Sequence, residues 1–189
     1  MFFWLIKIIA YVPFWLLYPT FIKRKTKLPK GKCIFVCNHI SNIDALILLN
    51  SFCRSQHVIA KKELFKRPLL RAFLKGMKAI PIDREKVEIS TIKQCMTVLK
   101  KNKVLTIFPE GTRNKTSEPL LEIKNGASIF AIKSGAPIVP LWFKKKPRLF
   151  RFNTLYVGEP FYITKEEADN SGEIIKNHLL NLREEHLKK

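Results

Sequence analysis

A histidine and an aspartate five positions apart, His39 and Asp44, lie where the chain passes from one apolar run to the next. On a continuous helix, residues at this spacing point about 140° apart, so their side chains would not meet. The apolar run Cys33–Cys37 predicts a buried strand, and Ala45–Leu49 predicts a helix. We therefore expect the chain to bend between them, with His39 in a loop and Asp44 at or near the helix start.

Such a pair could remove a proton from a hydroxyl group. A carboxylate that accepts the Nδ1 proton of an imidazole fixes its tautomer and stabilises the imidazolium that forms. A general base of this kind contributes about 10²–10⁴ in rate. The alternative is a core histidine beside an aspartate that caps a helix, and the spacing of His39 and Asp44 alone does not decide between them.

A second polar cluster, Phe108–Arg113 (FPEGTR), follows the fourth strand-like run, Val104–Phe108. Glu110 could accept hydrogen bonds from a polyol, and Thr112 could donate one beside Gly111. Arg113 could bind a phosphate through both arms of its guanidinium. The alternative is a polar turn with a local ion pair.

Two further cations follow predicted strands. Lys61 comes directly after His57–Ala60, and Arg84 follows Ala79–Ile82. Because α/β sheets gather their sites at the carboxyl ends of the strands, both could reach the edge where His39 is expected. Each cation taken singly fits a solvated surface position equally well.

The elements that must position these residues alternate along the chain, which favours an α/β fold: a mixed sheet flanked by helices. Strand-like runs are Cys33–Cys37, His57–Ala60, Ala79–Ile82, Val104–Phe108 and Pro137–Phe143, with Thr154–Val157 as an added edge strand. Helical patterns cover Ala45–Leu49, Arg67–Lys75, Glu88–Asn102, Gly126–Ser134 and the tail from Lys165. No repeat or low-complexity tract interrupts this order, so we expect one α/β domain over residues 28–189.

The N-terminal residues 1–27 form a different kind of segment. Phe2–Ile22 is almost wholly apolar, and its 21 residues approach the length that crosses a bilayer as a helix. Two prolines and Lys7 disfavour a straight crossing, while its Trp and Tyr residues suit a membrane interface. The basic stretch Lys23–Lys32 would hold the following domain on the cytoplasmic side. We expect attachment to the cell membrane, spanning or lying in one leaflet, rather than a buried core helix.

Composition narrows the classes of partner. The 189 residues carry a formal net charge of +20, which attracts nucleic acid, anionic lipid or an acidic protein. No nucleic-acid motif is present, so we expect no nucleic-acid partner. The four cysteines lie in apolar runs without a CxxC pair, which predicts reduced core residues. The scattered histidines predict no metal site.

Motifs of three other enzyme classes are absent from the sequence. The sequence contains no GxSxG, no GxxxxGK[ST] and no GxGxxG. Serine hydrolases, nucleotide hydrolases and dinucleotide oxidoreductases therefore lack support.

Five stretches in this order resemble the motifs of the lysophosphatidic acid acyltransferase family, the 1-acyl-sn-glycerol-3-phosphate acyltransferases. The stretches are Asn38–Asp44 (NHISNID, His followed by four residues and Asp), Ala60–Leu64, Ala79–Arg84, Phe108–Arg113 and Ala136–Pro140, within about residues 30–145. The resemblance implies transfer of a fatty acyl group from CoA or acyl carrier protein to the sn-2 hydroxyl of 1-acyl-glycerol-3-phosphate, giving phosphatidic acid. It implies membrane lipids as surroundings and neither a metal nor a cofactor.

Residue by residue, the resemblance makes His39 the general base and Asp44 the residue that orients it. It makes three cations the holders of the acceptor phosphate: Lys61, Arg84 and Arg113. It places Glu110, Gly111 and Thr112 along the acceptor pocket. Other acceptors, such as glycerol-3-phosphate or another lysophospholipid, stay open, and so does a basic membrane-binding module without enzymatic activity.

Overall fold

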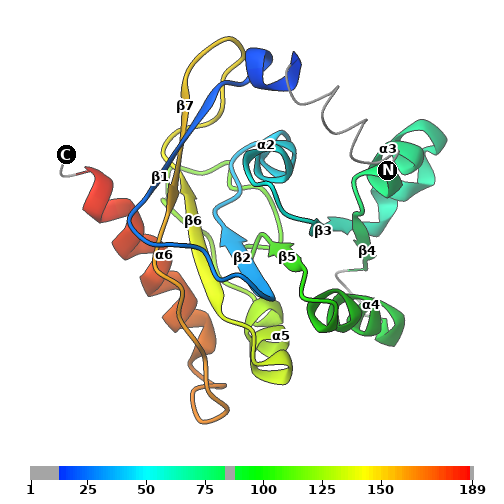
Figure 1. The fold of residues 1–189 in the computed structure, drawn as a ribbon, viewed down its shortest axis with the longest axis vertical. Helices are drawn as coiled ribbons and strands as arrows, with labels where there is room; N and C mark the ends of the chain where they lie inside the picture. The colour runs from blue at the N-terminus through cyan, green and yellow to red at the C-terminus, as the bar shows by residue number, and fades with distance from the viewer. Residues whose placement is uncertain (1–12, 84–87, 188–189) are drawn as a thin grey trace.

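The computed structural model of the chain describes residues 13–83 and 88–187. Its centre is a seven-stranded sheet in the order β1-β7-β6-β2-β5-β3-β4 (Figure 1). The strands are β1 (Thr20–Arg24), β2 (Cys33–Cys37), β3 (Gln56–Lys61), β4 (Ile80–Ile82), β5 (Val104–Ile107), β6 (Ile138–Phe143) and β7 (Asn153–Val157). The helices are α2 (Asp44–Ser51), the 3₁₀ helix η1 (Lys62–Lys66), α3 (Pro68–Gly76), α4 (Ile89–Lys100), α5 (Gly126–Ser134) and α6 (Ser171–Leu187). Residues 13–17 are also helical.

The sheet is mixed, as predicted. β2 pairs in parallel with β5 on one side and with β6 on the other, and β3 and β4 continue the parallel part. β7 pairs antiparallel with β6. All five residues of β2 are buried, which explains why this strand has no polar alternation in the sequence.

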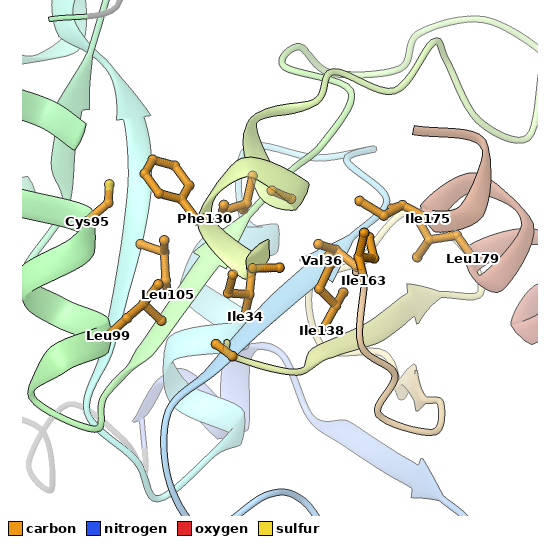
Figure 2. Close-up of a cluster of buried hydrophobic side chains, with 14 of the residues drawn as sticks. Ile34, Val36, Cys95, Leu99, Leu105, Phe130, Ile138, Ile163, Ile175 and Leu179 are labelled. Carbon is orange, nitrogen blue, oxygen red and sulfur yellow. The ribbon is translucent and has the colours of Figure 1, made fainter. Parts of the chain in front are cut away.

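Helices cover both faces of the sheet. Because side chains alternate along a strand, Ile34 and Val36 of β2 point to one face and Phe35 points to the other. The first face packs against α4, α5 and α6 through the residues shown in Figure 2, among them Leu99, Phe130 and Leu179. The second face packs against α2 and the helical residues 13–17 through a cluster that includes Ile47, Leu48 and Phe14. Each face thus has its own apolar core, and β2 lies between them.

Most predicted helices lie within a few residues of their predicted bounds, but their buried faces differ. α5 has the predicted bounds and ends at Gly135, whose φ of 62° is the left-handed conformation that glycine adopts readily. In α3, Leu69 and Phe73 were expected on a buried face, yet they are 88% and 51% exposed and only Leu74 is buried. In α4, Ile89 of the expected stripe is 71% exposed. The periodicity predicted these helices correctly, but it did not predict how many of their apolar side chains are buried.

The N-terminal region departs most from the sequence prediction. Residues 20–24, placed by the sequence in an apolar helical segment and a basic linker, form strand β1, which pairs in parallel with β7. The sheet therefore begins before the predicted boundary at residue 28, and β7 lies between β1 and β6 rather than at the edge. Residues 1–12 of the predicted membrane segment lie outside the described residues. In residues 13–83 and 88–187, no helix combines the length and apolar character of a membrane crossing.

One of the four cysteines lies outside the core, contrary to the sequence prediction. Cys33, Cys37 and Cys95 are buried free thiols, as expected, but Cys53 is exposed. Cys53 follows the end of α2, where the chain leaves the core.

Candidate functional site

The loops after β2 and β5 meet at one edge of the sheet. These strands are parallel neighbours, with Val36 paired to Ile107, so the chain leaves both strands side by side. The imidazole of His39 stacks on the ring of Phe108, with centroids 4.1 Å apart and planes at 22°. The two polar clusters that the sequence indicated separately therefore form one site.

The predicted contact between His39 and Asp44 is present. His39 lies in the loop after β2, Asp44 is the first residue of α2, and Nδ1 of His39 lies 3.0 Å from Oδ2 of Asp44. The same Oδ2 accepts the backbone N–H groups of Ile40 at 2.8 Å and Ser41 at 2.7 Å. The loop thus wraps around one carboxylate oxygen, which brings residues together that a continuous helix would separate.

This arrangement leaves one ring nitrogen for chemistry. A carboxylate only accepts hydrogen bonds, so Nδ1 of His39 must carry the proton that Asp44 accepts. In the neutral imidazole, Nε2 is then a proton acceptor. The His39 side chain is 15% exposed whereas that of Asp44 is fully buried, so the imidazole can be reached from solvent while the carboxylate cannot. Oδ1 of Asp44 is buried without a hydrogen bond in the part of the chain that the structure describes, which costs stability and indicates that the pair is not optimised for stability alone.

Glu110 joins the two loops. Its side chain is buried, Oε1 accepts the backbone N–H of His39 at 2.7 Å, and Oε2 accepts that of Leu121 at 2.9 Å. Burial raises the pKa of this carboxyl, while the two backbone donors and His39 act in the opposite direction. The sequence placed Glu110 in an acceptor pocket; in the structure Oε1 already accepts from the backbone of His39, and Oε2 from that of Leu121.

Two asparagines to which the sequence analysis gave no role in the site complete this support. The backbone N–H of Asn114 donates to the carbonyl of His39 at 2.7 Å, and its Oδ1 accepts from the backbone and hydroxyl of Thr116. Asn38 exchanges two hydrogen bonds with the backbone of Phe143 at the end of β6. Asn side chains often bond the backbone two residues on in an Asx turn, as Asn114 does with Thr116, but no sequence pattern indicates the bond between the backbones of Asn114 and His39.

The Gly111–Arg113 turn faces solvent. Gly111 has φ 68°, a conformation that favours glycine, and Thr112 and Arg113 are exposed. The aliphatic part of Lys124 lies over Gly111, where an added Cβ would be 3.0 Å from Cδ of the lysine. The Lys124 backbone N–H donates to the carbonyl of Pro109 at 2.9 Å, which fixes this segment against the turn. A second cation therefore lies beside the turn, 13 residues after Gly111 in sequence, and the sequence analysis did not identify it.

Of the other two predicted cations, the structure describes Lys61 and does not join it to this cluster. Lys61 ends β3 opposite Ile82 of β4, and its Nζ lies 3.6 Å from Oε1 of Glu63. Across the described residues, no hydrogen bond or ion pair connects Lys61 with His39 or Glu110. Arg84 lies outside the described residues.

One family profile matches the part of the chain that contains both loops. The sequence profile of the acyltransferase family matches residues 20–144, a range that begins at β1 and contains both loops. The chain belongs to the acyltransferase family. The matched range includes strand β1, Thr20–Arg24, which pairs with β7.

Several similar proteins share a name within this acyltransferase family. The 1-acyl-sn-glycerol-3-phosphate acyltransferase of Bacillus subtilis is 35% identical over 135 residues, which cover 68% of this chain and 66% of that protein. The protein of that name in Helicobacter pylori is 38% identical over 128 residues, covering 66% of this chain and 54% of its own length. The chain thus spans less than two thirds of the length of these relatives.

A solved structure has the same fold. The crystal structure of the 1-acyl-sn-glycerophosphate acyltransferase PlsC from Thermotoga maritima superposes with a TM-score of 0.63 at 22% identity. The match covers 94% of this chain and 76% of that one. At this identity the likeness concerns the fold, and it agrees with the mixed sheet flanked by helices.

Proposed function

We propose that this acyltransferase-family chain transfers a fatty acyl group from an acyl thioester of CoA or acyl carrier protein to the sn-2 hydroxyl of 1-acyl-glycerol-3-phosphate, giving phosphatidic acid. The observation that carries the proposal is the His39–Asp44 contact of 3.0 Å, with Glu110 holding the backbone of His39. The names of the relatives support the choice of acceptor.

In the proposed mechanism, Nε2 of His39 removes the proton of the sn-2 hydroxyl. The resulting alkoxide attacks the thioester carbonyl, forming a carbon–oxygen bond and a tetrahedral oxyanion. The carbon–sulfur bond then breaks, and the leaving thiolate takes the proton from the His39 imidazolium. The Asp44 carboxylate stabilises the imidazolium while His39 holds this proton.

Transfer without an acyl-enzyme intermediate agrees with the environment of the Cys37 thiol. Cys37 is two residues from His39 but is fully buried at the end of β2. Burial, with the charges of Asp44 and Glu110, raises its pKa well above the ordinary range of a thiol. A thiol that resists ionisation is a poor nucleophile, so an acyl-cysteine intermediate at Cys37 is disfavoured.

The oxyanion needs hydrogen-bond donors, and most amides of the site are already engaged. The N–H groups of Ile40 and Ser41 donate to Asp44, and that of Gly111 donates to the carbonyl of Phe108. Within the described chain, the amides of Thr112 and Arg113 form no hydrogen bond. We assign these two amides to the oxyanion, where preorganised donors lower the barrier most.

The acceptor phosphate would lie against the cations of the exposed turn. Arg113 suits bidentate binding of a phosphate, and Lys124 adds a second positive charge beside Gly111. Lys61 and Arg84 are assigned to the same task by the family resemblance. Holding the phosphate fixes the hydroxyl against His39, and such orientation contributes several kcal/mol to catalysis, on the order of the effective-molarity gains of intramolecular reactions.

The lipid acceptor and product imply attachment to a membrane, with the site on the cytoplasmic side. The apolar sequence of residues 1–12 and the exposed Trp15, Leu16 and Leu17 support attachment through the N-terminal segment. A deletion of this segment that leaves activity on bilayer substrate intact would contradict this part of the proposal.

The test is acyl transfer to 1-acyl-glycerol-3-phosphate in detergent micelles, from acyl-CoA and from acyl carrier protein, with wild type and His39→Ala. We expect wild-type activity with at least one donor and a loss of about 10²-fold or more in His39→Ala. His178→Ala, which removes a histidine stacked on Phe161 away from the site, is the matched control and should retain activity. Full activity of folded His39→Ala would overturn the mechanism. Activity with glycerol-3-phosphate in place of the lysophospholipid would reassign the acceptor.

A further inference from the structure

The connection between β6 and β7 has an unusual composition for a surface loop. Residues 144–152 (KKKPRLFRF), here called the β6–β7 loop, contain five cations and no acidic residue. Three of its apolar side chains are exposed: Leu149 by 48%, Phe150 by 69% and Phe152 by 71%. Exposed apolar side chains that cluster among polar ones are typical of surfaces that bind a protein, a membrane or another ligand.

The structure holds this loop in place rather than leaving it free. The side chain of Asn153 accepts the backbone N–H of Arg148 at 2.9 Å and donates to the carbonyls of Arg148 and Arg151. Phe150 has φ 53°, a left-handed conformation that is rare for an aromatic residue. The backbone is therefore fixed in a turn whose apolar side chains point outward.

The loop continues an apolar surface of the N-terminal region. The backbone N–H of Phe150 donates to the carbonyl of Leu17 at 2.7 Å, and the ring of Phe152 stacks on Phe21 at 5.0 Å. Trp15 and Leu16 in the adjacent helical residues are 42% and 58% exposed. Figure 1 shows the loop beside this helix at the top of the molecule, far from α5. One surface thus combines both segments, and the apolar residues 1–12 precede it directly in the sequence.

This surface begins at the same edge of the sheet as the candidate site. β6 runs parallel to β2, and Phe143 at its end pairs with Asn38, the residue before His39. Lys144, the first residue of the loop, follows Phe143. A ligand bound by the loop would therefore lie close to the level at which substrate must reach His39.

We propose that the β6–β7 loop is a second membrane contact, which inserts Leu149, Phe150 and Phe152 into the interface of an anionic bilayer. The five cations complement anionic head groups, and the apolar side chains suit the boundary between head groups and acyl chains. Nucleic acid would match the charge but leave the aliphatic Leu149 and the neighbouring Leu16 uncovered. The contact goes beyond attachment through residues 1–27, because it fixes the orientation in which the site faces the lipid.

The first test compares binding of full-length variants to vesicles of phosphatidylglycerol and phosphatidylcholine, with thermal unfolding as a check of folding. Phe150→Ser/Phe152→Ser should lower the partition coefficient about tenfold or more. Ile129→Ser, which removes a 45% exposed apolar side chain from α5, is the matched control and should bind like the wild type. Lys145→Gln/Lys146→Gln should weaken binding to anionic vesicles at low salt only. Wild-type binding by folded Phe150→Ser/Phe152→Ser would overturn the proposal.

A second test is independent of that variant and of attachment through the N-terminal segment. In a Cys53→Ser background, which removes the exposed cysteine, Leu149→Cys and Ile129→Cys each carry an environment-sensitive fluorophore. Vesicles should shift the emission of the Leu149→Cys label to the blue and leave that of the Ile129→Cys label unchanged. If vesicles change the emission of both labels equally, or of neither, the proposal is overturned. A shift of the Leu149→Cys label caused by nucleic acid or an acidic protein but not by vesicles assigns the surface to that partner instead.

Discussion

Oε1 of Glu110 accepts the backbone N–H of His39 at 2.7 Å, so a residue of the loop after β5 fixes the main chain of the proposed base after β2. The backbone carbonyl of His39 accepts from Asn114, which belongs to the same segment as Glu110. The histidine is therefore held on both sides by one neighbouring segment. The contact with Asp44 and the stacking on Phe108 restrict the rotation of its ring. Such restriction keeps a base in position for proton transfer.

Replacing Glu110 should affect both stability and rate. In Glu110→Gln the amide offers one acceptor oxygen to two backbone donors, so either His39 or Leu121 loses its partner. A buried N–H without a partner costs about 1–3 kcal/mol, which lowers the melting temperature by about 2–4 °C per kcal/mol in a chain of this size. We expect kcat to fall about tenfold because His39 is less well fixed. Thermal unfolding and acyl-transfer assays check this, with Glu122→Gln, an exposed neighbour, as the control. A rise in KM alone would return Glu110 to the acceptor pocket.

Replacing Asp44 should separate charge from geometry. The three side-chain hydrogen bonds of Asp44 in the described chain all use Oδ2, so in Asp44→Asn an amide oxygen at that position keeps the loop and the tautomer of His39. The negative charge that stabilises the imidazolium is lost, and kcat should fall about 10²–10⁴-fold. Asp44→Ala should in addition unfold at a lower temperature, because the amides of Ile40 and Ser41 lose their acceptor. Near wild-type kcat in Asp44→Asn would mean that Asp44 only shapes the loop.

The sequence predicted what depends on local pattern. Strand β2 has the predicted bounds Cys33–Cys37, and the helix predicted over Ala45–Leu49 extends from Asp44 to Ser51. The bend between them brings His39 to Asp44 as expected. The parallel order of β2 and β5 then explains why Phe108–Arg113 lies beside His39. Strand length, helix start and side-chain spacing are set within a few residues of chain, and this is why they could be predicted.

What the sequence did not predict depends on partners far along the chain. Thr20–Arg24 is a strand because β7, more than a hundred residues later, offers it an edge, while the preceding apolar residues gave it the appearance of a membrane segment. Lys124 reaches Gly111 only because the intervening chain folds back onto Pro109. Such contacts are products of tertiary packing, which propensity and periodicity do not contain.

Lys124 should contribute to binding of the acceptor phosphate. Its side chain covers Gly111 beside Arg113, and a charge-assisted hydrogen bond contributes about 1.5–3 kcal/mol. Lys124→Gln should therefore raise KM for 1-acyl-glycerol-3-phosphate about tenfold or more, with kcat changed little because uniform binding is lost. Lys115→Gln, an exposed lysine of the same connection, is the matched control, and Lys124→Arg should restore part of the affinity. An unchanged KM in Lys124→Gln would remove this residue from the phosphate site.

His57 should make the fold sensitive to acid. Burial, with the charges of Lys103 and Lys78, lowers its pKa to about 4, and its Nε2 is buried without a partner among the described residues. The unfolded chain binds a proton near the ordinary pKa of about 6.5, whereas the folded chain does so only near 4, so protons favour unfolding between these values. The free energy of unfolding should thus be unaffected by His57 above pH 7 and should decline as the pH falls from 6.5 to 4, by about 1 kcal/mol once solvent screening of this half-buried ring is allowed for.

The variant His57→Gln tests this. Its melting temperature should fall less between pH 7 and pH 5 than that of the wild type. A residual slope should persist, because burial lowers the pKa of His178 as well. Identical pH dependence of the two proteins would mean that His57 takes up its proton in the folded state without cost.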